Sequence, residues 1–537
     1  MKWLTAAAIL LALSCAAGGV AAKPAARVPG RAPTSATARP LRPPTAATSP
    51  VNRGGQESPT LAQMLHGTPG PELAGLAIVV ADHNGPVRAE ALGSAVLDPA
   101  RVRALTPDTP VRVASISKLV VALTAWRLIE QGKLSPDADV STYLGWPLRN
   151  PAHPDARITL RQLLSHTSSI DDGPGYSFGR TATLRDGLTP AHWSAAMPGI
   201  RFSYANLNYG IVATVLEAVT HTRFDRLARE QVLTPLHLDA CYNWSGCSPQ
   251  AVANAAVLYR RGKDETAWNP AGPWVAQVDD LHGIAPACPV RGEAACDLTA
   301  YVPGTNGTLF SPQGGLRISA RGLAKLGRLI LNRGEVDGVR LLRPQTVDAM
   351  LAPVWRDNGQ PSGDTYNGLM RIYASGPQLL SGEPRQRDQP VDGRTVAWAG
   401  HLGEAYGLLG GLWIDRARGR VYVYLITGLG DDPARYPGHR SAFSAVEEAV
   451  LGELANFADV TIRPRPRLSN MERNVFVTGV QVTARKLTLF VCVSAFAGPT
   501  FAAAETQSIR YRPVRKPSGT CREPQRSILS RTQEQSR

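Results

Sequence analysis

The stretch that decides the fold is residues 115–129, which read SISKLVVALTAWRLI. From Leu119 the residues are apolar almost without interruption, which is typical of a helix that is buried on all sides. Gly132 follows as a stop signal. Ser115 and Lys118 therefore fall at the start of a buried helix, three residues apart and on one face. The unpaired backbone N–H groups and positive dipole end at such a start stabilise developing negative charge.

Two further short motifs follow in the chain, YAN at 204–206 and HLG at 401–403. The first supplies a phenol that can carry a proton and an amide that can orient a carbonyl. The second lies in strand-like sequence, where a glycine lets a substrate approach the backbone closely. A serine alone is a weak nucleophile and needs a neighbouring base, which Lys118 or Tyr204 would provide. Since each motif also arises by chance, the prediction of a serine active site depends on all three and on their order.

Each motif also has a purely structural interpretation. Ser115 can cap a core helix while Lys118 extends to solvent. Tyr204 can be a buried tyrosine with a satisfied hydroxyl, and His401 can be a structural residue at a strand end. All of these interpretations would have to hold together for the catalytic one to fail.

Residues 61–458 resemble the serine β-lactamase and penicillin-binding protein superfamily. The resemblance is to its class C-like branch of β-lactamases, D-alanyl-D-alanine carboxypeptidases, D-aminopeptidases and esterases. Besides the three motifs, it rests on the segments ITLRQLLSHTSSI (158–170), PLHLDACY (235–242) and SPQGGLRISARGLAKLGRLIL (311–331). It implies an α/β (α+β) fold of the β-lactamase/transpeptidase type, with an antiparallel sheet flanked by helices and a mostly helical inserted region.

The resemblance also implies roles for individual residues. Ser115 would be the acylated nucleophile, with Lys118 and Tyr204 handling its proton. The residues expected to contact the substrate are Asn206, His401 and Gly403. The oxyanion hole would consist of the backbone N–H groups of Ser115 and Glu404.

The chain departs from the family pattern in places. Class C β-lactamases have K-T-G where this chain has HLG at 401–403, so a permanent cation is replaced by a group that titrates near neutrality. Leu402 removes a hydrogen-bond partner for a substrate carboxylate, although protonated His401 would supply an anchor at mildly acidic pH. Ser169 and His221 stand where the family usually has glycine.

We therefore expect weak or no hydrolysis of β-lactams, and activity on D-amino-acid peptides or small esters through an acyl-enzyme on Ser115. Two alternatives stay open. One is a class C-type β-lactamase, and the other is a non-catalytic protein that holds peptidoglycan or penicillin in the same cleft. The expected partner is a small-molecule or peptide substrate, with peptidoglycan as one source.

The N-terminal sequence predicts export. Residues 1–22 contain Lys2, an apolar core and small residues at the end, as in a secretory signal peptide. Cys15 raises lipidation as an alternative, but Ala12 stands where such sites prefer leucine. Residues 23–58 are rich in proline, alanine and threonine, cannot bury a core, and predict a flexible linker. The hydrolase domain is then 59–460, in a periplasmic or secreted protein rather than a lipoprotein.

The chain contains seven cysteines, and four of them form close pairs in the hydrolase region. In an exported protein such pairs predict small disulfide-closed loops, Cys241 with Cys247 and Cys288 with Cys296. Their spacings are not those of zinc sites and no histidine cluster accompanies them. We expect no metal and no cofactor.

The net charge of +15 comes from the two ends of the chain. Residues 1–58 carry +6 and residues 461–537 carry +10, which leaves −1 for the hydrolase domain. A near-neutral body has no electrostatic footprint for nucleic acid, so we exclude that class of partner. The basic ends suit attraction to an anionic envelope, or are simply solvated.

The C-terminal segment 461–537 is a basic tail of unknown role with a short apolar run at 487–504. Gly498-Pro499 breaks that run. A disordered tail, a weak membrane anchor and a fused neighbouring reading frame are the alternatives. Within the hydrolase domain, Asn84-Gly85 predicts a hairpin, and strands over 394–427 are expected to complete the same sheet, followed by a helix over 441–458.

Overall fold

The computed structural model describes residues 59–462, apart from 265, 291–295 and 361, and the strand residues 475–483, 486–493 and 506–509. The expected signal peptide and linker, at 1–22 and 23–58, lie outside the described residues. The chain divides into two compact units after Thr461.

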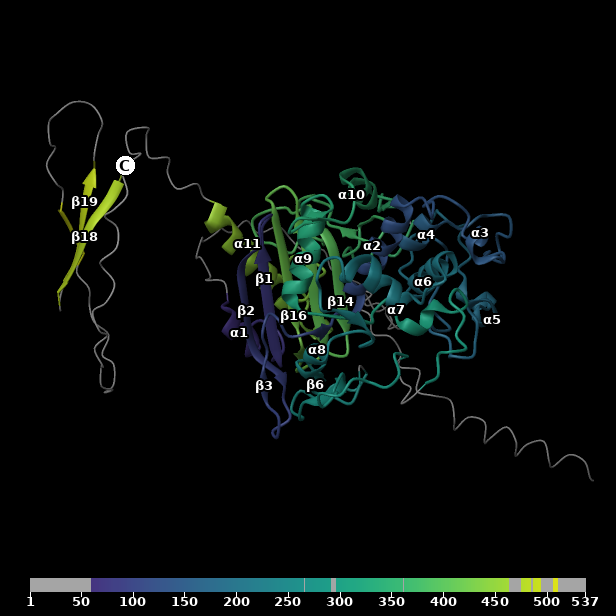
Figure 1. The fold of residues 1–537 in the computed structure, drawn as a ribbon, viewed down its shortest axis with the longest axis horizontal. Helices are drawn as coiled ribbons and strands as arrows, with labels where there is room; N and C mark the ends of the chain where they lie inside the picture. The colour runs from purple at the N-terminus through teal and green to yellow at the C-terminus, as the bar shows by residue number, and fades with distance from the viewer. Residues whose placement is uncertain are drawn as a thin grey trace, which may run out of the picture. The chain divides into compact units, whose positions relative to one another are not determined.

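The first unit is built on a nine-stranded antiparallel sheet (Figure 1). In order across the sheet, its strands are β11 (Trp355–Arg356), β12 (Ile372–Tyr373), β13 (Gln378–Leu379), β14 (Ala399–Ala405), β15 (Leu408–Asp415), β16 (Arg420–Ile426), β1 (Gly75–Ala81), β2 (Pro86–Val96) and β3 (Arg103–Ala104). β1 pairs with β16, with Leu76 opposite Ile426. The expectation that the beginning and end of this region share one sheet is therefore confirmed.

The hairpin predicted at Asn84-Gly85 is present, and the strands expected over 394–427 include a second one. β1 and β2 flank the turn that contains Asn84-Gly85, which the Asp82 N–H closes by donating to the Gly85 carbonyl at 2.9 Å. β15 and β16 flank residues 416–419. Alternating apolar residues on these strands point to opposite faces, so the sheet has two faces to bury.

Helices cover both faces of the sheet. On one face α1 (Leu61–Leu65) and α11 (Ala445–Ile462) pack over Tyr422 and Tyr424, and α11 supplies Val450 and Leu454 to that core. This confirms the helix expected after the last strands. On the other face lies α9 (Ala320–Leu331), where a Cβ on Gly327 would stand only 2.4 Å from Cγ1 of Val421. Glycine there allows the helix to lie directly on the sheet.

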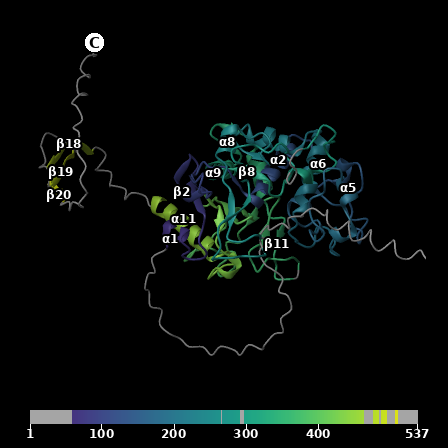
Figure 2. The same ribbon diagram turned by 90° about the horizontal axis from the view of Figure 1, so that it is seen from below.

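A mostly helical region is inserted between β4 (Val111–Arg112) and β8 (Leu316–Ile318). Figure 2 shows its helices on the side of the sheet away from α1 and α11. Its elements are η1 (Ala114–Ile116), α2 (Ser117–Glu130), α3 (Ser141–Leu144), α4 (Leu160–Leu164), α5 (Leu184–Gly187), η2 (Pro190–His192), α6 (Leu207–Thr220), α7 (Phe224–Ala228), η3 (Arg229–Leu233), β5 (Cys241–Tyr242), α8 (Pro249–Ala253), β6 (Leu258–Arg260), β7 (Val275–Val278) and η4 (Gly307–Phe310). α2 and α6 form the centre of this region, and their side chains are buried almost all round.

Small sheets join the two parts. β8 pairs with both β4 and β5, so the strand before Ser115 is tied to the strand before α9. The remaining elements are β9 (Glu335–Val336), β10 (Val339–Arg340), α10 (Pro344–Leu351), β17 (Gly428–Leu429) and η5 (Pro433–Arg435). The observed architecture is the one expected, an antiparallel sheet flanked by helices with a mostly helical insertion.

The second unit contains three antiparallel strands, β18 (Val475–Thr483), β19 (Lys486–Val493) and β20 (Thr506–Ile509). The tail thus contains regular structure. Its β-branched residues and its alternation of apolar and polar residues favour strands. β19 takes up the beginning of the apolar run at 487–504. None of the helices in the described part of the chain is both long and apolar enough to cross a membrane.

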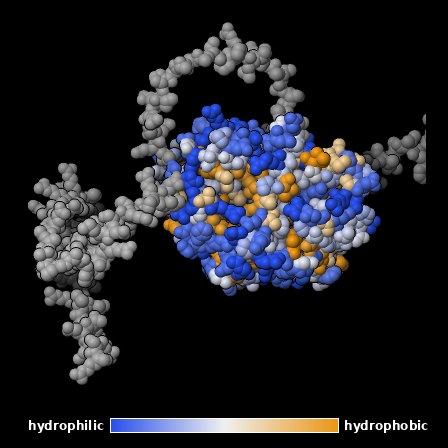
Figure 3. All heavy atoms as spheres, turned by 90° about the horizontal axis from the view of Figure 1, so that it is seen from above, coloured by the Kyte–Doolittle hydropathy of each residue, from blue (hydrophilic) through white to orange (hydrophobic). Residues whose placement is uncertain are grey.

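The surface of the first unit is mixed in character. On the face in Figure 3, hydrophobic residues lie scattered among hydrophilic ones. The large exposed hydrophobic side chains come from several segments of the chain: Val87, Val102 and Ile284 are far apart in the sequence, and only Met197 and Ile200 share one loop among these five. Single exposed hydrophobic residues of this kind are ordinary.

Candidate active site

Ser115 lies in the short 3-10 turn η1, immediately before α2 begins at Ser117. The sequence placed Ser115 in the first turn of the helix itself, so the helix begins two residues later than expected. Ala114 has a left-handed backbone with φ of 45°, a conformation that is costly for a residue with a Cβ. The chain thus turns sharply just before Ser115, whose side chain keeps 5% of its surface exposed.

Lys118 is fully buried and contacts Ser115 directly. Its Nζ donates to Ser115 Oγ at 2.9 Å, to Asn206 Oδ1 at 2.8 Å and to the Gln313 carbonyl at 3.1 Å. The structural alternative, in which the lysine extends to solvent, is excluded because the side chain is 0% exposed. Burial lowers the pKa of Lys118 to about 7, although the charge of Asp172 acts in the opposite direction. A substantial fraction of the amine is therefore neutral at physiological pH.

Aromatic rings surround this amine. Nζ of Lys118 lies 4.8 Å from the ring centroid of Tyr204 and 5.4 Å from that of Tyr209. His166, from the segment 158–170, stacks on Tyr204 with 4.2 Å between ring centroids. Its Nδ1 accepts a hydrogen bond from the Ala205 N–H at 3.1 Å. His166 therefore holds both the ring and the backbone of the second motif.

Tyr204 shares a hydrogen bond with Ser115. Burial raises the pKa of Tyr204 well above its ordinary value, and the hydrogen bond with Ser115 offsets this only in part. The phenol therefore stays protonated at neutral pH. It lies beside both Ser115 and the Lys118 amine, as a group that can accept one proton while it gives up another.

Asn206 is oriented by a residue that sequence reasoning missed. Asp172 Oδ2 accepts from the Asn206 N–H at 2.7 Å and from Asn206 Nδ2 at 3.0 Å, and its Oδ1 accepts from the Leu207 N–H at 2.9 Å. These bonds turn Oδ1 of Asn206 toward Lys118. Burial raises the pKa of Asp172, while the bonds from Leu207 and Asn206 lower it. Nothing in the local sequence around Asp172 signals this contact.

The start of the segment 311–331 lies beside Ser115 and Lys118, since Gln313 and Gly314 line the same pocket as Ser115. The Gly314-Gly315 turn brings the Gln313 carbonyl to Lys118, and a Cβ on Gly315 would stand 2.7 Å from the Ser311 carbonyl. The N–H of Leu316 donates to Ser117 Oγ at 3.0 Å. The sequence marked this segment by resemblance but gave its carbonyls no role.

His401 is fully buried, and both of its ring nitrogens have partners. Nδ1 lies 2.6 Å from the Leu402 carbonyl and Nε2 lies 2.7 Å from the Tyr373 hydroxyl. A carbonyl can only accept, so Nδ1 carries the proton and Tyr373 donates to Nε2. Burial, with a contribution from Lys118, lowers the pKa of His401 to about 3. The expectation of a protonated His401 as a carboxylate anchor at mildly acidic pH is therefore wrong.

Gly403 has a packing role. A Cβ at this position would stand 2.4 Å from the Val113 carbonyl and 3.1 Å from Cγ1 of Ile116. The sequence reasoning assigned the space beside this glycine to a substrate, but the segment that carries Ser115 fills it. Glycine therefore lets β14 lie directly against η1.

A narrow cleft, with a cavity volume of about 30 Å³, opens beside Ser115. The sequence-predicted residues that line it are Ser115, Asn206 and Glu404, whereas His401 and Gly403 are not among its lining residues. Tyr176 and Tyr406, from two different loops, and Arg112 also line it. The two expected donors of the oxyanion hole, Ser115 and Glu404, thus belong to one cleft.

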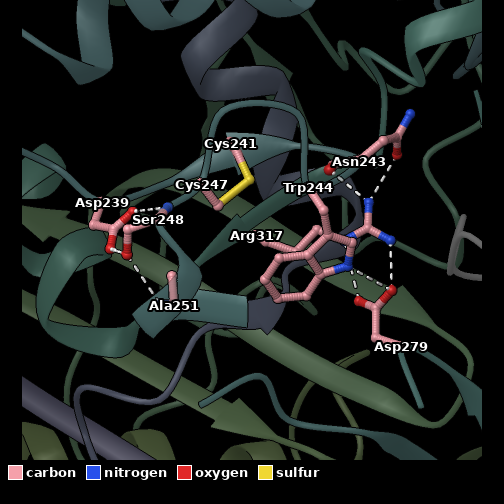
Figure 4. Close-up of a disulfide and its surroundings, with 10 residues drawn as sticks. Asp239, Cys241, Asn243, Trp244, Cys247, Ser248, Ala251, Asp279 and Arg317 are labelled. Carbon is pink, nitrogen blue, oxygen red and sulfur yellow. Dashed lines mark hydrogen bonds and ion pairs between the residues drawn. A yellow bond between two sulfur atoms is a disulfide. The ribbon is translucent and has the colours of Figure 1, made fainter. Parts of the chain in front are cut away.

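The two predicted disulfides, Cys241–Cys247 and Cys288–Cys296, are both present. Figure 4 shows the first beside a buried ion pair, in which Arg317 lies between Asn243 and Asp279. Arg317 Nε and Nη2 donate to the two carboxylate oxygens of Asp279 at 3.0 and 2.8 Å. Burial alone would raise the pKa of Asp279, but the charge of Arg317 holds this pKa below its usual value. This cluster fixes β5 against β8, which begins shortly after Gln313.

Two departures from the family pattern have a backbone explanation. Ser169 has φ of 69° and His221 has φ of 52°, both in the left-handed region. Glycine adopts that region without strain, which is why it is common at such positions. Neither side chain lines the cleft, and both substitutions concern backbone conformation.

The β-lactamase family model matches residues 63–447, more than half of the chain. The chain belongs to the β-lactamase family. This confirms the family resemblance and the serine-hydrolase class that the three motifs predicted.

Two curated relatives illustrate the range of the β-lactamase family around this chain. The D-alanyl-D-alanine-carboxypeptidase/endopeptidase AmpH of Escherichia coli K12 is 30% identical over 137 residues, which are 24% of this chain and 35% of AmpH. The esterase/beta-lactamase LipL of Mycobacterium tuberculosis is 27% identical over 262 residues, 45% of this chain and 56% of LipL. The matched parts span less than two thirds of either relative.

Solved structures of other β-lactamase-family proteins share the fold. The octameric penicillin-binding protein homologue from Pyrococcus abyssi has a TM-score of 0.51 and 18% identity over 84% of this chain and 88% of its own. EstCE1, a hydrolase with promiscuous acyltransferase activity, has a TM-score of 0.50 and 21% identity over 71% of this chain and 94% of its own. At these identities the likeness concerns the fold alone.

Within the described ranges, no group of three or more His, Cys, Asp or Glu side chains could hold a metal ion. The polar groups beside Ser115 are an amine, a phenol, an amide and backbone atoms. That set of groups suits acyl transfer with proton movement between side chains.

Proposed function

We propose that this protein is a serine hydrolase that works through an acyl-enzyme on Ser115. The observation that carries the proposal is the contact of 2.9 Å between Lys118 Nζ and Ser115 Oγ, made by a buried amine whose pKa is lowered to about 7. A neutral amine at hydrogen-bond distance is the neighbour that turns a serine into a nucleophile.

The steps of the reaction follow from these contacts. Ser115 Oγ forms a bond to the acyl carbon, and its proton passes to Lys118 Nζ. The leaving group departs with a proton returned through Tyr204, and water then cleaves the Ser115 ester to release the acid. We assign the base to Lys118 and not to Tyr204, since burial lowers the pKa of the amine and raises that of the phenol.

The remaining cleft residues fit supporting roles. The backbone N–H groups of Ser115 and Glu404 would hold the developing oxyanion, as donors of this kind do in acyl transfer. Asn206, held by Asp172, would orient the amine and the substrate carbonyl. His401 and Gly403 would shape the cleft from behind.

For the substrate we propose D-amino-acid peptides or small esters. The names of AmpH and LipL support these two classes. The alternative of a class C-type β-lactamase loses support from His401, because a neutral ring does not replace a lysine cation. A non-catalytic peptidoglycan-binding protein would not need a buried lysine whose pKa is lowered to about 7.

We also propose that the protein is exported, to the periplasm or the medium. The two short disulfides support this, because disulfides persist in oxidising compartments. Attraction of the basic ends to an anionic envelope, with peptidoglycan as a partner, is part of the same proposal.

The test is covalent labelling of the purified protein with a fluorophosphonate probe and a fluorescent penicillin. Label is expected on the wild type and should be lost in Ser115→Ala. Ser117→Ala is the matched control, because Ser117 Oγ is bonded to the Ala114 carbonyl and the Leu316 N–H instead. Labelling should persist in this control. No label on the folded wild type with either probe would show that the proposal is wrong.

A further inference from the structure

Arg112 carries a buried positive charge at the wall of the cleft that no part of the proposed reaction uses. The side chain is only 4% exposed, and its Nε donates to the Gly314 carbonyl at 3.1 Å. Its Nη1 is buried without a hydrogen-bond partner. A buried guanidinium nitrogen without an acceptor is costly, and such a group calls for an explanation.

Neighbouring carboxylates do not neutralise Arg112 directly. Among the described residues, none of the ion pairs includes Arg112, whereas the nearby Asp279 is bonded through both oxygens to Arg317. Glu404, which lines the same cleft, has an interaction of its own. The guanidinium instead lies against the ring of Tyr406, with 4.7 Å from Cζ to the ring centroid.

The position of Arg112 is fixed relative to the nucleophile. It is the last residue of β4, three residues before Ser115, and β4 is paired with β8. Arg112, Ser115 and Tyr406 line the same cleft. A ligand bound at Ser115 would therefore lie beside Arg112, whose Nη1 has no hydrogen-bond partner within the protein.

We propose that Arg112 is a specificity-determining residue that binds a free carboxylate on the substrate, close to the bond that Ser115 attacks. This inference rests on the proposed function and narrows its substrate class to acids, such as peptides or esters with a free C-terminal carboxylate. Guanidinium groups bind carboxylates well, since their N–H donors match the oxygens. Arg112 supplies the cation that a neutral His401 does not.

The test measures binding in a Ser115→Ala background, where no turnover takes place. The ligands are N-acetyl-D-alanyl-D-lactate and its C-terminal carboxamide, which differ only in the charge of one group. A charge-assisted hydrogen bond predicts that the carboxylate binds about tenfold to a hundredfold more tightly. Arg112→Gln in the same background should bring the two dissociation constants within about threefold, and Arg112→Lys should restore part of the preference.

Arg321→Gln is the matched control, because it removes one positive charge from an exposed arginine that is paired with Asp108. It should keep the full preference for the carboxylate. Thermal unfolding of every variant checks that it is folded. Equal affinity of the Ser115→Ala protein for the two ligands would overturn the proposal, as would an undiminished preference in folded Arg112→Gln. Since binding requires no turnover, this outcome is independent of whether Ser115 in the wild type is labelled.

Discussion

Two buried cations, Lys118 and Arg317, lie on elements next to Ser115 and have opposite surroundings. Lys118 is bonded to neutral oxygens and aromatic rings, and its pKa falls to about 7. Arg317 is bonded to both oxygens of Asp279 and holds the pKa of that carboxyl low. Burial is common to both, and the direct carboxylate partner is one difference. A buried lysine without such a partner has its pKa lowered far enough to act as a base, whereas a guanidinium keeps its charge and, when paired with a carboxylate, holds two segments together.

The largest expected effect comes from removing the base. Lys118→Met should slow acylation of Ser115 by about 10²–10⁴-fold, the usual range for a general acid–base group. Labelling rates with a fluorophosphonate measure this.

Stability separates this role from a structural one. The pKa of Lys118 is lower in the folded protein than in the unfolded chain, so between about 7 and 10.5 the unfolded state binds more protons and stability rises with pH. Replacing the lysine should therefore help stability more at pH 7 than at pH 10. A variant that loses the same stability at pH 7 and at pH 10 would show that Lys118 has only a structural role.

The second effect concerns the buried ion pair of Arg317 and Asp279. Arg317→Met leaves the carboxylate of Asp279 buried without its partner, which costs about 3–5 kcal/mol of unfolding free energy. Urea denaturation measures it. The double variant Arg317→Met/Asp279→Asn, which has no buried charge at this place, should recover most of the loss. If it does not, the charge pairing is not what matters there.

The third effect tests the loop that carries the neighbours of Arg317. Cys241→Ser/Cys247→Ser opens a loop with a sequence separation of 6, and chain entropy for so short a loop predicts a loss of about 2 kcal/mol. The pair Cys288→Ser/Cys296→Ser, with a separation of 8, is the matched comparison. Because Cys241 lies on β5, we expect the first pair to slow Ser115 labelling more than the second.

The smallest effect is a pH dependence in the wild type. Lys118 must be neutral to accept the serine proton, so the acylation rate should rise with pH through a midpoint near 7, by about tenfold per unit well below it. His401, with a pKa of about 3, should leave no inflection between pH 5 and 6.5. A midpoint near 6.5 that disappears in His401→Asn would contradict the neutral histidine.

Sequence reasoning found the residues that are chemically distinctive and close together in the chain. Ser115 and Lys118 share one turn, and the apolar residues from Leu119 show that the helix is buried. The dipeptide Asn84-Gly85 likewise predicts a hairpin turn without reference to the rest of the chain. These parts of the fold and site depend on local geometry, so a single sequence predicts them.

The missed residues act through contacts between distant segments. Asp172 matters because it meets Asn206, and Arg112 matters because Gly314 and Tyr406 surround it. His401 was expected to reach the substrate, yet Tyr373 and the bond to the Leu402 carbonyl hold it inside. A pattern in one segment does not show which other segment will bury it.

The pairing of β1 with β16 has a consequence for how the chain is made. β1 and β2 are synthesised early, but the strand beside β1 comes some 340 residues later along the chain. Until then the edge of β1 that faces away from β2 has no partner strand. Such long-range strand pairing is slow, and the unpaired edge is prone to aggregation meanwhile. The central sheet therefore closes only when nearly all of the catalytic unit has left the ribosome. A chain that folds this late has no complete active site for most of its synthesis.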